Sequence, residues 1–419
     1  MAIFPYNSAF TRVTSLAAQR AVHAAFAWLH GNPKTVMDWQ AEMVAIPAPP
    51  FGEEARSAWL AARFAEVGLS GVEIDAIGNV FGWLKAAKLS AESTGPVVVL
   101  SAHLDTVFPA GTTLNPVLNG DRLEAPGACD NGAGVAGMLA IARALTGSGA
   151  KLAAPLVFMG NVGEEGEGDL RGMRQLYNGG ALAGRIAAHI VMDGAGADSA
   201  VTQALGSRRY RVTVTGPGGH SFTDAGTANP IAALASALVA VAETPLPEEP
   251  RTTLSLGTIQ GGTSVNSIPE SAQASIDFRS TSGEQLLLLE VALHRAVEDA
   301  VEQWNARAKA AGKNGRGLLA FKIDKIGDRP AALLPAGSPL LEALSAVDRH
   351  LSLRTKLRLG STDANIPLSL GVPALSIGAG GDGGGAHTAA EWYSAKDRET
   401  GLKRVLLLAL AMTEWAAEQ

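Results

Sequence analysis

Four short apolar runs, each ending in or leading within a short loop to a histidine or an acidic residue, constrain the fold of this chain more than any other feature. They read PVVVLSAH, APLVFMGN, AHIVMDG and PALSIGAG. Between the first two lies NGAGVAGMLAIARALTG, in which apolar residues recur at helical spacing. Two more helices are expected within residues 35–68, on either side of the break PAPPFG. Strands that alternate with helices predict an α/β fold with a mainly parallel sheet and helices on both faces.

A different pattern interrupts this alternation between the third and the fourth run. Residues 208–216 and 251–280 alternate as half-exposed antiparallel strands do, and residues 229–243 and 283–312 are typical of helices. We therefore expect an α+β domain inserted over residues 206–330. The first domain would comprise residues 1–205 and 331–419, which suits a chain of 419 residues.

Charge and cysteine content exclude several classes of protein. A net charge of −6 gives no basic face for nucleic acid or for an anionic membrane. The single cysteine, Cys129, excludes an internal disulfide and suits a reducing compartment. The amino terminus does not have the pattern of a signal peptide, and apolar runs such as VLLLALAM are far shorter than the roughly 18 residues of a membrane span. These features predict a cytoplasmic protein with neither nucleic-acid nor membrane partners.

Residue types that bind metals gather where the four apolar runs end. In a parallel sheet the carboxyl ends of the strands meet at one edge, where ligands bind. Buried carboxylates are costly unless they pair with hydrogen bonds or with a cation. Imidazoles and carboxylates at one edge therefore predict a metal site, and zinc accepts both. The residues are His103, Asp105, Asp130, Glu164, Glu165, Asp193 and His387.

Each of these residues also has an ordinary structural explanation. Taken alone, His103 would be a buried core histidine and Asp105 a turn residue. Asp130 stands where a helix N-cap is expected. The pair Glu164 and Glu165 would lie in a solvated loop, and Asp193 in a turn. Only their convergence on one edge of the sheet favours the metal site over these explanations.

The glycine-rich loop GAGGDGGGAH allows a second interpretation. Residues 378–383 match G-x-G-x-x-G after a strand, as in dinucleotide-binding proteins. That motif should open a helix directly, whereas here the chain continues into more glycine and then His387. The sequence favours a flexible loop that delivers His387 over a nucleotide site.

Motifs along nearly the whole chain resemble those of one family. In order they are HLDTVF, ACDNGAG, EEGEG, VMDG, GPGGHS, GGTSVNSIPE, DFRS, GSTDAN and GAHTAAEW. They resemble the motifs of the two-zinc exopeptidase and deacylase family that includes peptidase T, glutamate carboxypeptidase and acetylornithine deacetylase, and they are closest to those of peptidase T-like aminopeptidases. The chain departs from the family pattern at Asn131-Gly132, where Asp-Lys is common, and at Cys129. Neither departure removes a ligand.

The resemblance implies a specific set of ligands for two zinc ions. Asp130 would bridge the two ions. His103 and Asp193 would complete one site, and Glu165 and His387 the other. Co²⁺ or Mn²⁺ could replace Zn²⁺.

Three further residues are expected to support the ligands or the reaction. Asp105 would orient the ring of His103. Glu164, next to the ligand Glu165, would be the general base for the attacking water. Glu391 would either support the ligands or cap a helix.

The inserted domain carries candidate substrate contacts. The resemblance implies that His220 reaches an active site and polarises the scissile carbonyl, although a histidine in such a loop could also be an ordinary surface residue. Asn266 and Arg279 are candidate substrate clamps, and Arg279 could instead pair with Asp277. The resemblance also implies that this domain is a lid, whose exposed strand or helix makes a homodimer.

These expectations combine into one predicted function. We expect a two-zinc peptidase that hydrolyses an amide bond in short peptides, as a dipeptide or tripeptide aminopeptidase. In the family, aspartate at the position of Asp193 is common in aminopeptidases and dipeptidases, whereas carboxypeptidases and deacylases commonly carry glutamate. An N-acyl amino acid deacylase or a carboxypeptidase, with an acylated amino acid or peptide as substrate, would use the same metal chemistry. A non-enzymatic metal-binding or peptide-binding protein is the alternative from a different class.

Overall fold

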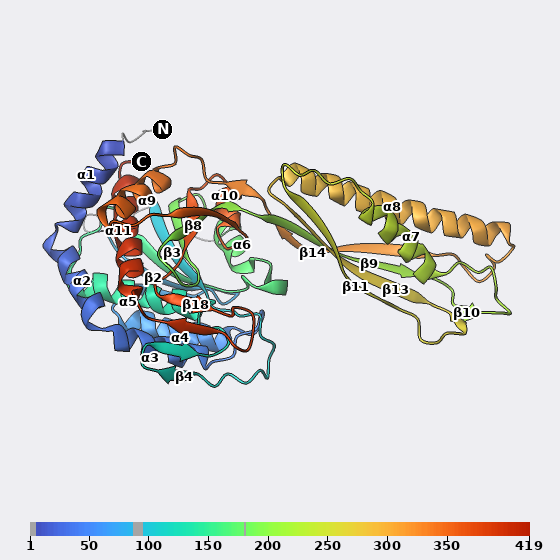
Figure 1. Cartoon of the computed structure of the whole chain (residues 1–419), viewed down its shortest axis with the longest axis horizontal. Helices are drawn as coiled ribbons and strands as arrows, with labels where there is room; N and C mark the ends of the chain where they lie inside the picture. Colours follow the sequence, from blue (N-terminus) through green and yellow to red (C-terminus); the bar gives the residue numbers. More distant parts are fainter. Residues whose placement is uncertain (1–5, 87–94, 180–181) are drawn as a thin grey trace. The chain divides into compact units, whose positions relative to one another are not determined.

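The computed structural model describes residues 6–86, 95–179 and 182–419 (Figure 1). Residues 1–5, part of the stretch for which no signal peptide is predicted, lie outside the described residues. The chain divides into two compact units, one of residues 1–204 and 333–419 and one of residues 205–332. The insertion predicted over residues 206–330 falls within the second unit. Within the described ranges, no helix is both long enough and apolar enough to cross a membrane.

A large mixed sheet forms the centre of the first unit (Figure 1). Its nine strands, counted over the described residues, follow the order β1-β2-β6-β3-β7-β17-β8-β15, and β16 also pairs with β8. The predicted α/β fold is confirmed. The pairs along β6, β3, β7 and β17 are parallel, as is the outer pair of β8 with β16, whereas β1 with β2, β2 with β6 and β8 with β17 are antiparallel. The strands are β1 (Ser70–Ile74), β2 (Val80–Leu84), β3 (Val97–His103), β6 (Leu156–Asn161), β7 (Ile186–Met192), β8 (Ser199–Ala204), β15 (Ala332–Leu333), β16 (Lys356–Gly360) and β17 (Ala374–Ile377).

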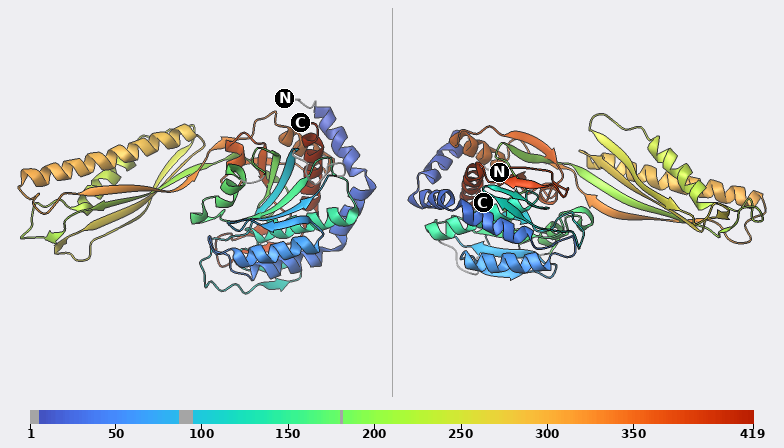
Figure 2. Two further views of the ribbon diagram at one scale, coloured as in Figure 1. Left: turned by 180° about the vertical axis from the view of Figure 1, so that it is seen from behind. Right: turned by 60° about the horizontal axis from the view of Figure 1, so that its bottom comes forward.

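Helices cover both faces of this sheet (Figures 1 and 2). On one face, Val97 and Val99 of β3 pack with Met173 and Leu176 of α6 in one apolar cluster. Helices α5 and α11 contact β3 and β7. The helices of this unit are α1 (Tyr6–Ala17), α2 (Arg20–Gly31), α3 (Pro33–Val44), α4 (Glu54–Glu66), α5 (Gly132–Ser148), α6 (Arg171–Asn178), α9 (Pro339–His350), α10 (Asn365–Ser369) and α11 (Arg398–Ala416).

A small second sheet in this unit carries part of the glycine-rich loop. It has the strand order β18-β19-β5-β4. Arg122, on β5, places its guanidinium carbon 3.9 Å from the ring centroid of Trp392, on β19. The strands are β18 (Asp382–Gly384), β19 (Trp392–Ser394), β5 (Arg122–Glu124) and β4 (Val117–Asn119).

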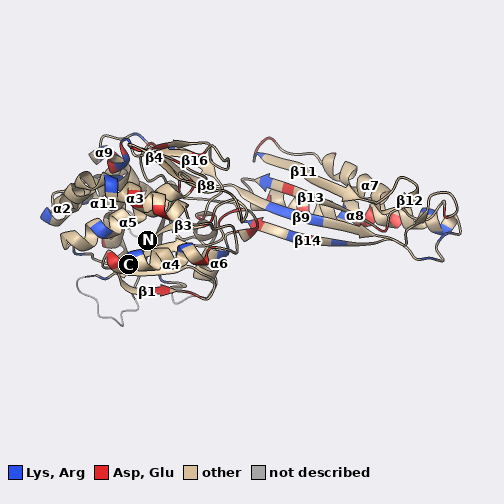
Figure 3. Cartoon of the chain, turned by 90° about the horizontal axis from the view of Figure 1, so that it is seen from below, with Lys and Arg blue, Asp and Glu red and all other residues tan. Residues whose placement is uncertain are grey.

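The second unit is an antiparallel sheet with two helices on one face (Figure 1). Its strand order is β11-β13-β9-β14, with β10 and β12 as a separate short pair. Helix α8 turns Leu286, Leu289 and Leu293 toward the core that it shares with α7 and the sheet. Figure 3 shows the ribbon of the second unit coloured by charge, with basic positions along β9 and charged positions along β13 and β14. The elements are β9 (Gly206–Thr215), β10 (Gly219–His220), α7 (Pro230–Ala242), β11 (Thr252–Gly261), β12 (Ser267–Ile268), β13 (Ser271–Ser280), α8 (Gly283–Ala310) and β14 (Ala320–Arg329).

Candidate metal centre

The parallel centre of the large sheet delivers most of the predicted ligands to one edge. Strand β3 is buried along its whole length and ends at His103. Glu165 follows β6, and Asp193 follows β7 directly. Asp130 precedes α5, and His387 lies between β18 and β19. Because β6, β3, β7 and β17 are neighbouring parallel strands, the loops at their carboxyl ends lie at the same edge.

Asp130 lies between the two predicted histidine ligands. Its Oδ1 is 3.1 Å from Nε2 of His103, and its Oδ2 is 3.1 Å from Nε2 of His387. Nε2 of His387 is also 3.0 Å from Oε1 of Glu165. Nε2 of His103 is 3.9 Å from Oδ1 of Asp193. The two carboxylate oxygens of Asp130 thus face two separate groups of donors.

Three groups of side chains in the described residues have the composition and spacing of metal ligands. In each, one nitrogen or oxygen from every member lies within 4.8 Å of the others. Two of the groups share Asp130, and in both it is joined by one histidine and one further carboxylate. The groups are His103 with Asp130 and Asp193, Asp130 with Glu165 and His387, and His103 with Glu164 and Glu165.

The electrostatics of the metal-free residues show a site with crowded negative charge. Burial and the neighbouring Glu164 raise the pKa of Glu165 to about 8. Burial and Asp130 raise the pKa of Asp193 to about 7. The hydrogen bond to Asp130 is the main reason that the pKa of His387 rises to about 9. Burial and mutual repulsion thus favour the protonated forms of Glu165 and Asp193, whereas the hydrogen bonds to His103 and His387 lower the pKa of Asp130. A divalent cation would relieve the repulsion between the carboxylates.

These residues fit two divalent cations. Each group that contains Asp130 offers one imidazole nitrogen and two carboxylates, which are the ligand types of catalytic zinc sites. A carboxylate with one oxygen toward each group can bridge two ions, as in two-metal hydrolytic sites. The repulsion between the buried carboxylates also favours the binding of cations at this site.

Asp105 differs from its predicted role in one respect. Nδ1 of His103 is 3.1 Å from the main-chain oxygen of Asp105 and 3.8 Å from the carboxylate. The carboxylate instead accepts the main-chain N–H of Glu164 at 3.0 Å and that of Glu165 at 2.7 Å. The ring is therefore oriented by a carbonyl, while the side chain of Asp105 fixes the loop that carries Glu164 and Glu165. Spacing along a strand cannot distinguish these two acceptors of the same residue.

Glu391 holds the loop that carries Asp130. It is buried, and its two carboxylate oxygens accept the main-chain N–H groups of Gly127 at 2.8 Å, Cys129 at 2.8 Å and Asp130 at 2.7 Å. The sequence allows Glu391 either to support the ligands or to cap a helix, and the geometry corresponds to support of the loop that carries Asp130. It does not cap a helix.

Asn131 is the N-cap of α5, a position for which the sequence pattern also allowed Asp130. Its Oδ1 accepts the N–H of Gly134 at 3.1 Å and that of Gly194 at 3.2 Å, and its Nδ2 donates to the carbonyl of Met192 at 2.9 Å. The side chain thus ties the start of α5 to the end of β7, on either side of Asp193. Asp130 is free of this capping function.

His220 and Asn266 lie together in the second unit. His220 pairs with Ser267 across β10 and β12, and the N–H of Ser221 donates to the carbonyl of Asn266 at 3.0 Å. Nδ1 of His220 accepts the N–H of Phe222 at 3.2 Å. In the neutral ring the proton therefore resides on Nε2, which makes that nitrogen a donor. The side chain of His220 is exposed.

Arg279 is remote from this pair. It lies eight residues along β13 from Ser271, about 27 Å at the usual rise of about 3.4 Å per residue, while the loop with Asn266 adjoins the Ser271 end. Nε of Arg279 is 2.7 Å from Oδ2 of Asp277. The ion pair that was the alternative for Arg279 is thus present.

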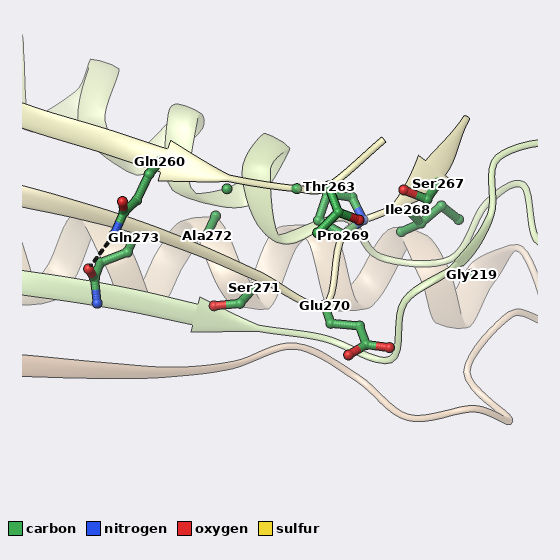
Figure 4. A pocket seen from close by; sticks show the side chains of 12 residues that line it. Gly219, Gln260, Thr263, Ser267, Ile268, Pro269, Glu270, Ser271, Ala272 and Gln273 are labelled. Carbon is green, nitrogen blue, oxygen red and sulfur yellow. Dashed lines mark hydrogen bonds between the residues drawn. The ribbon is translucent and has the colours of Figure 1, made fainter. Parts of the chain in front are cut away.

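An open pocket of about 740 Å³ lies beside His220 and Asn266, at one end of the sheet of the second unit. Figure 4 shows Gln260 and Gln273 joined across its lining by a hydrogen bond of 2.9 Å. Gly219 and Ser267, the chain neighbours of His220 and Asn266, also line the pocket. None of the metal-site residues does.

Comparison with known proteins gives one family and several similar structures. The sequence model described as "Peptidase family M20/M25/M40" matches residues 99–411. No curated protein matches the chain in sequence.

Three solved structures illustrate the similarity in fold. Aminopeptidase PepT from Bacillus cereus ATCC 10987 has 19% identity and a TM-score of 0.68, over 91% of this chain and 99% of that one. A tripeptidase from Staphylococcus aureus subsp. aureus Mu50 has 20% identity and a TM-score of 0.70, over 93% and 99%. A dinuclear metal binding peptidase of the M20 family from Bacillus subtilis has 17% identity and a TM-score of 0.61, over 91% and 98%. At these identities the similarity shows the fold.

Proposed function

The chain belongs to peptidase family M20/M25/M40, and on this basis we propose that it is a two-zinc aminopeptidase that removes the first residue of dipeptides and tripeptides. Family membership makes it a metal-dependent hydrolase of peptide bonds. The observation that carries the proposal is the position of Asp130 between two groups of donors, each with one histidine and one further carboxylate. Glu165 and His387 belong to one group, and His103 and Asp193 to the other.

In the proposed mechanism the protein supplies an oriented base and an oriented donor. When bound, two zinc ions would polarise the scissile carbonyl and lower the pKa of a water molecule. Glu164 accepts the proton of the attacking water and returns it to the leaving amine. Glu164 is suited to this role for two reasons. The side chain of Asp105 fixes its main chain, and its carboxylate lies within 4.8 Å of candidate metal-binding atoms of His103 and Glu165. His220, with its proton on Nε2, donates to the developing oxyanion.

A free amino terminus is the expected substrate feature. The site is rich in carboxylates, and an α-ammonium group forms charge-assisted hydrogen bonds with carboxylates that an acyl group would forfeit. The resemblance of Asp193 to the aspartate of aminopeptidases supports the same choice. Substrates would therefore be short peptides with an unblocked first residue.

Paired substrates test this proposal. Trialanine should be cleaved at its first bond, and N-acetyl-trialanine should have a much lower kcat/KM. The same assay should include acetylated amino acids, with release of acetate as the readout. Equal or faster cleavage of the blocked peptide, or release of acetate, would favour the deacylase or carboxypeptidase alternative. No hydrolysis of any substrate by the zinc-loaded chain would favour a binding protein.

The second unit supports a proposed homodimer. Strand β11 ends the four-stranded sheet, and within the described residues its outer edge pairs with no strand. Its exposed side chains include Leu256 and Ile259, and α7 adds the exposed Val239. An unpaired apolar edge is suited to pairing with the same edge of a second copy.

Sedimentation velocity at micromolar concentrations should give a dimer for the native chain. Ile259→Lys should shift the population toward monomer, because a charge at the edge opposes pairing. A native chain that sediments as a monomer at all these concentrations would contradict the dimer. We further propose that the chain is a cytoplasmic enzyme, which localisation of a tagged chain would test.

A further inference from the structure

Arg56 is a buried guanidinium that contacts the chain next to His103, at the end of β3. It lies on α4 and is 1% exposed. Leu60 and Phe64, one and two turns further along α4, are buried apolar residues, so Arg56 occupies a core position of this helix. A buried cation is costly unless hydrogen bonds and opposite charges compensate it.

Two main-chain carbonyls receive hydrogen bonds from Arg56. Its Nε donates to the oxygen of Ile46 at 2.7 Å, and its Nη1 donates to the oxygen of Leu104 at 2.7 Å. Leu104 stands between His103 and Asp105. Its own N–H donates to the carbonyl of Asn161 at 2.8 Å. The peptide groups that connect His103 to Asp105 are therefore held from both sides, and Arg56 provides one of the two attachments.

The charges of Asp105 and Glu391 favour the cationic form of Arg56, whose buried Nη2 donates to no described residue. Burial lowers its pKa to about 10, and the nearby charges of Asp105 and Glu391 act in the opposite direction. Arg56 therefore remains a cation at neutral pH. Asp105 fixes the main chain of Glu164 and Glu165, and Glu391 fixes that of Asp130, so both carboxylates hold loops that carry predicted metal-site residues.

We propose that Arg56 is a positioning residue for the metal centre, which fixes the end of β3 through the carbonyl of Leu104 and supplies the positive charge shared by Asp105 and Glu391. This inference rests on the proposed two-metal site. Arg56 touches no ligand directly. It acts through the geometry of His103 and of the loops that these carboxylates hold.

The chemistry requires arginine at this position. The planar guanidinium directs separate N–H groups at the carbonyls of Ile46 and Leu104, which come from different segments of the chain. A lysine ammonium is a point charge without this fixed fork. Lysine would keep the charge but lose part of the positioning.

The test compares Arg56→Met and Arg56→Lys with the control Arg404→Met. Arg404 is fully buried, and its hydrogen bonds go to Asp348, Ser199 and Thr355. For each purified chain, zinc affinity would be measured by chelator competition, the thermal midpoint without metal, and kcat and KM on trialanine with saturating zinc. Both methionine variants should lower the midpoint.

Only the Arg56 variants should affect the metal centre. Arg56→Met should weaken zinc affinity by at least about 10-fold and lower kcat by a similar factor, in the range measured when residues that orient metal ligands are lost. KM should change by less than about two-fold, since Arg56 touches no substrate. Arg56→Lys should weaken zinc affinity by about three-fold or more, because lysine keeps the positive charge but lacks the planar set of N–H donors.

Several results would overturn the inference. One is native zinc affinity and kcat in Arg56→Met, and another is an equal loss of zinc affinity in Arg404→Met. If Arg56→Met does not fold, native zinc affinity in Arg56→Lys would overturn it. A native chain that binds no zinc would overturn the proposed function, and this inference with it.

Discussion

One carboxylate oxygen of Glu391 accepts the main-chain N–H of Asp130 at 2.7 Å. Glu391 thus holds Asp130 by its backbone and leaves both side-chain oxygens of Asp130 to face His103 and His387. A residue four positions after the predicted ligand His387 therefore holds the main chain of Asp130, the predicted bridging residue. Both groups of candidate ligands that contain Asp130 therefore depend on this contact.

Glu391→Gln should weaken zinc binding. Glutamine offers one acceptor oxygen instead of two, so its amide N–H₂ would face the N–H of Gly127 or those of Cys129 and Asp130. We expect zinc affinity to fall by about 10-fold to 100-fold, measured by chelator competition. Glu399→Gln is the control, because Glu399 pairs with His30 and Lys403 on the surface. Unchanged affinity in Glu391→Gln would refute the positioning function of Glu391.

Glu164→Gln should separate metal binding from turnover. The amide keeps the size of the side chain but cannot accept the proton of the attacking water, so kcat should fall by at least about 10² while the zinc content stays native. Glu167→Gln, at an exposed position of the same loop, should have native kcat. Near-native turnover in Glu164→Gln would mean that another group is the base.

His220→Ala should lower kcat through loss of the oxyanion donor, a contribution of roughly 3 kcal/mol. Zinc content should not change. His294, an exposed histidine on α8, gives the control His294→Ala. If both variants have the same kcat as the native chain, His220 is an ordinary surface histidine, the alternative that the sequence allowed.

Glu290 makes the stability of the second unit dependent on pH. It pairs with Arg208 and lies 3.0 Å from Nζ of Lys325. Burial would raise its pKa, but the hydrogen bond from Lys325 and the other positive charges hold the pKa of Glu290 below its usual 4.5. Since the folded pKa is the lower one, the stabilisation is present above about pH 4.5 and is lost as the pH falls through the folded value.

Glu290→Gln should therefore cost about 1 kcal/mol of unfolding free energy at pH 7 and less near pH 3, which lies below the unfolded pKa of about 4.5. Urea unfolding at the two pH values measures the difference. Glu298→Gln, at an exposed position of the same helix, is the control. A cost for Glu290→Gln that is equal at both pH values would mean that its charge does not cause the effect.

Much of the parallel centre could be predicted because its strands are continuous apolar runs. Strands β3 and β6 are buried along their whole lengths, so their sequences show no interruption. The sequence does not predict β1 and β16, because they are short and largely exposed and their side chains follow no clear apolar pattern. The sequence therefore predicts the centre of this sheet better than its edges.

The side chains that carry ligands were easier to identify than those that position them. Arg56 gives a weak sequence signal, a charge at the spacing of the buried residues Leu60 and Phe64. Asn131 gives none beyond its capping preference, because its contacts with Met192 and Gly194 form only in the folded chain. Hydrogen bonds to main-chain atoms leave no pattern in the sequence. For the same reason the sequence does not predict that the carbonyl of Asp105, and not its carboxylate, orients the ring of His103.

The zinc content of the purified chain decides whether Asp130 lies between two metal ions. Purified protein saturated with Zn²⁺ and freed of excess metal by gel filtration would be analysed for zinc and for protein by elemental and amino-acid analysis. We predict two zinc ions per chain and loss of peptide hydrolysis on chelation, because Asp130 belongs to two groups of candidate ligands. One ion per chain, or none, would contradict this prediction.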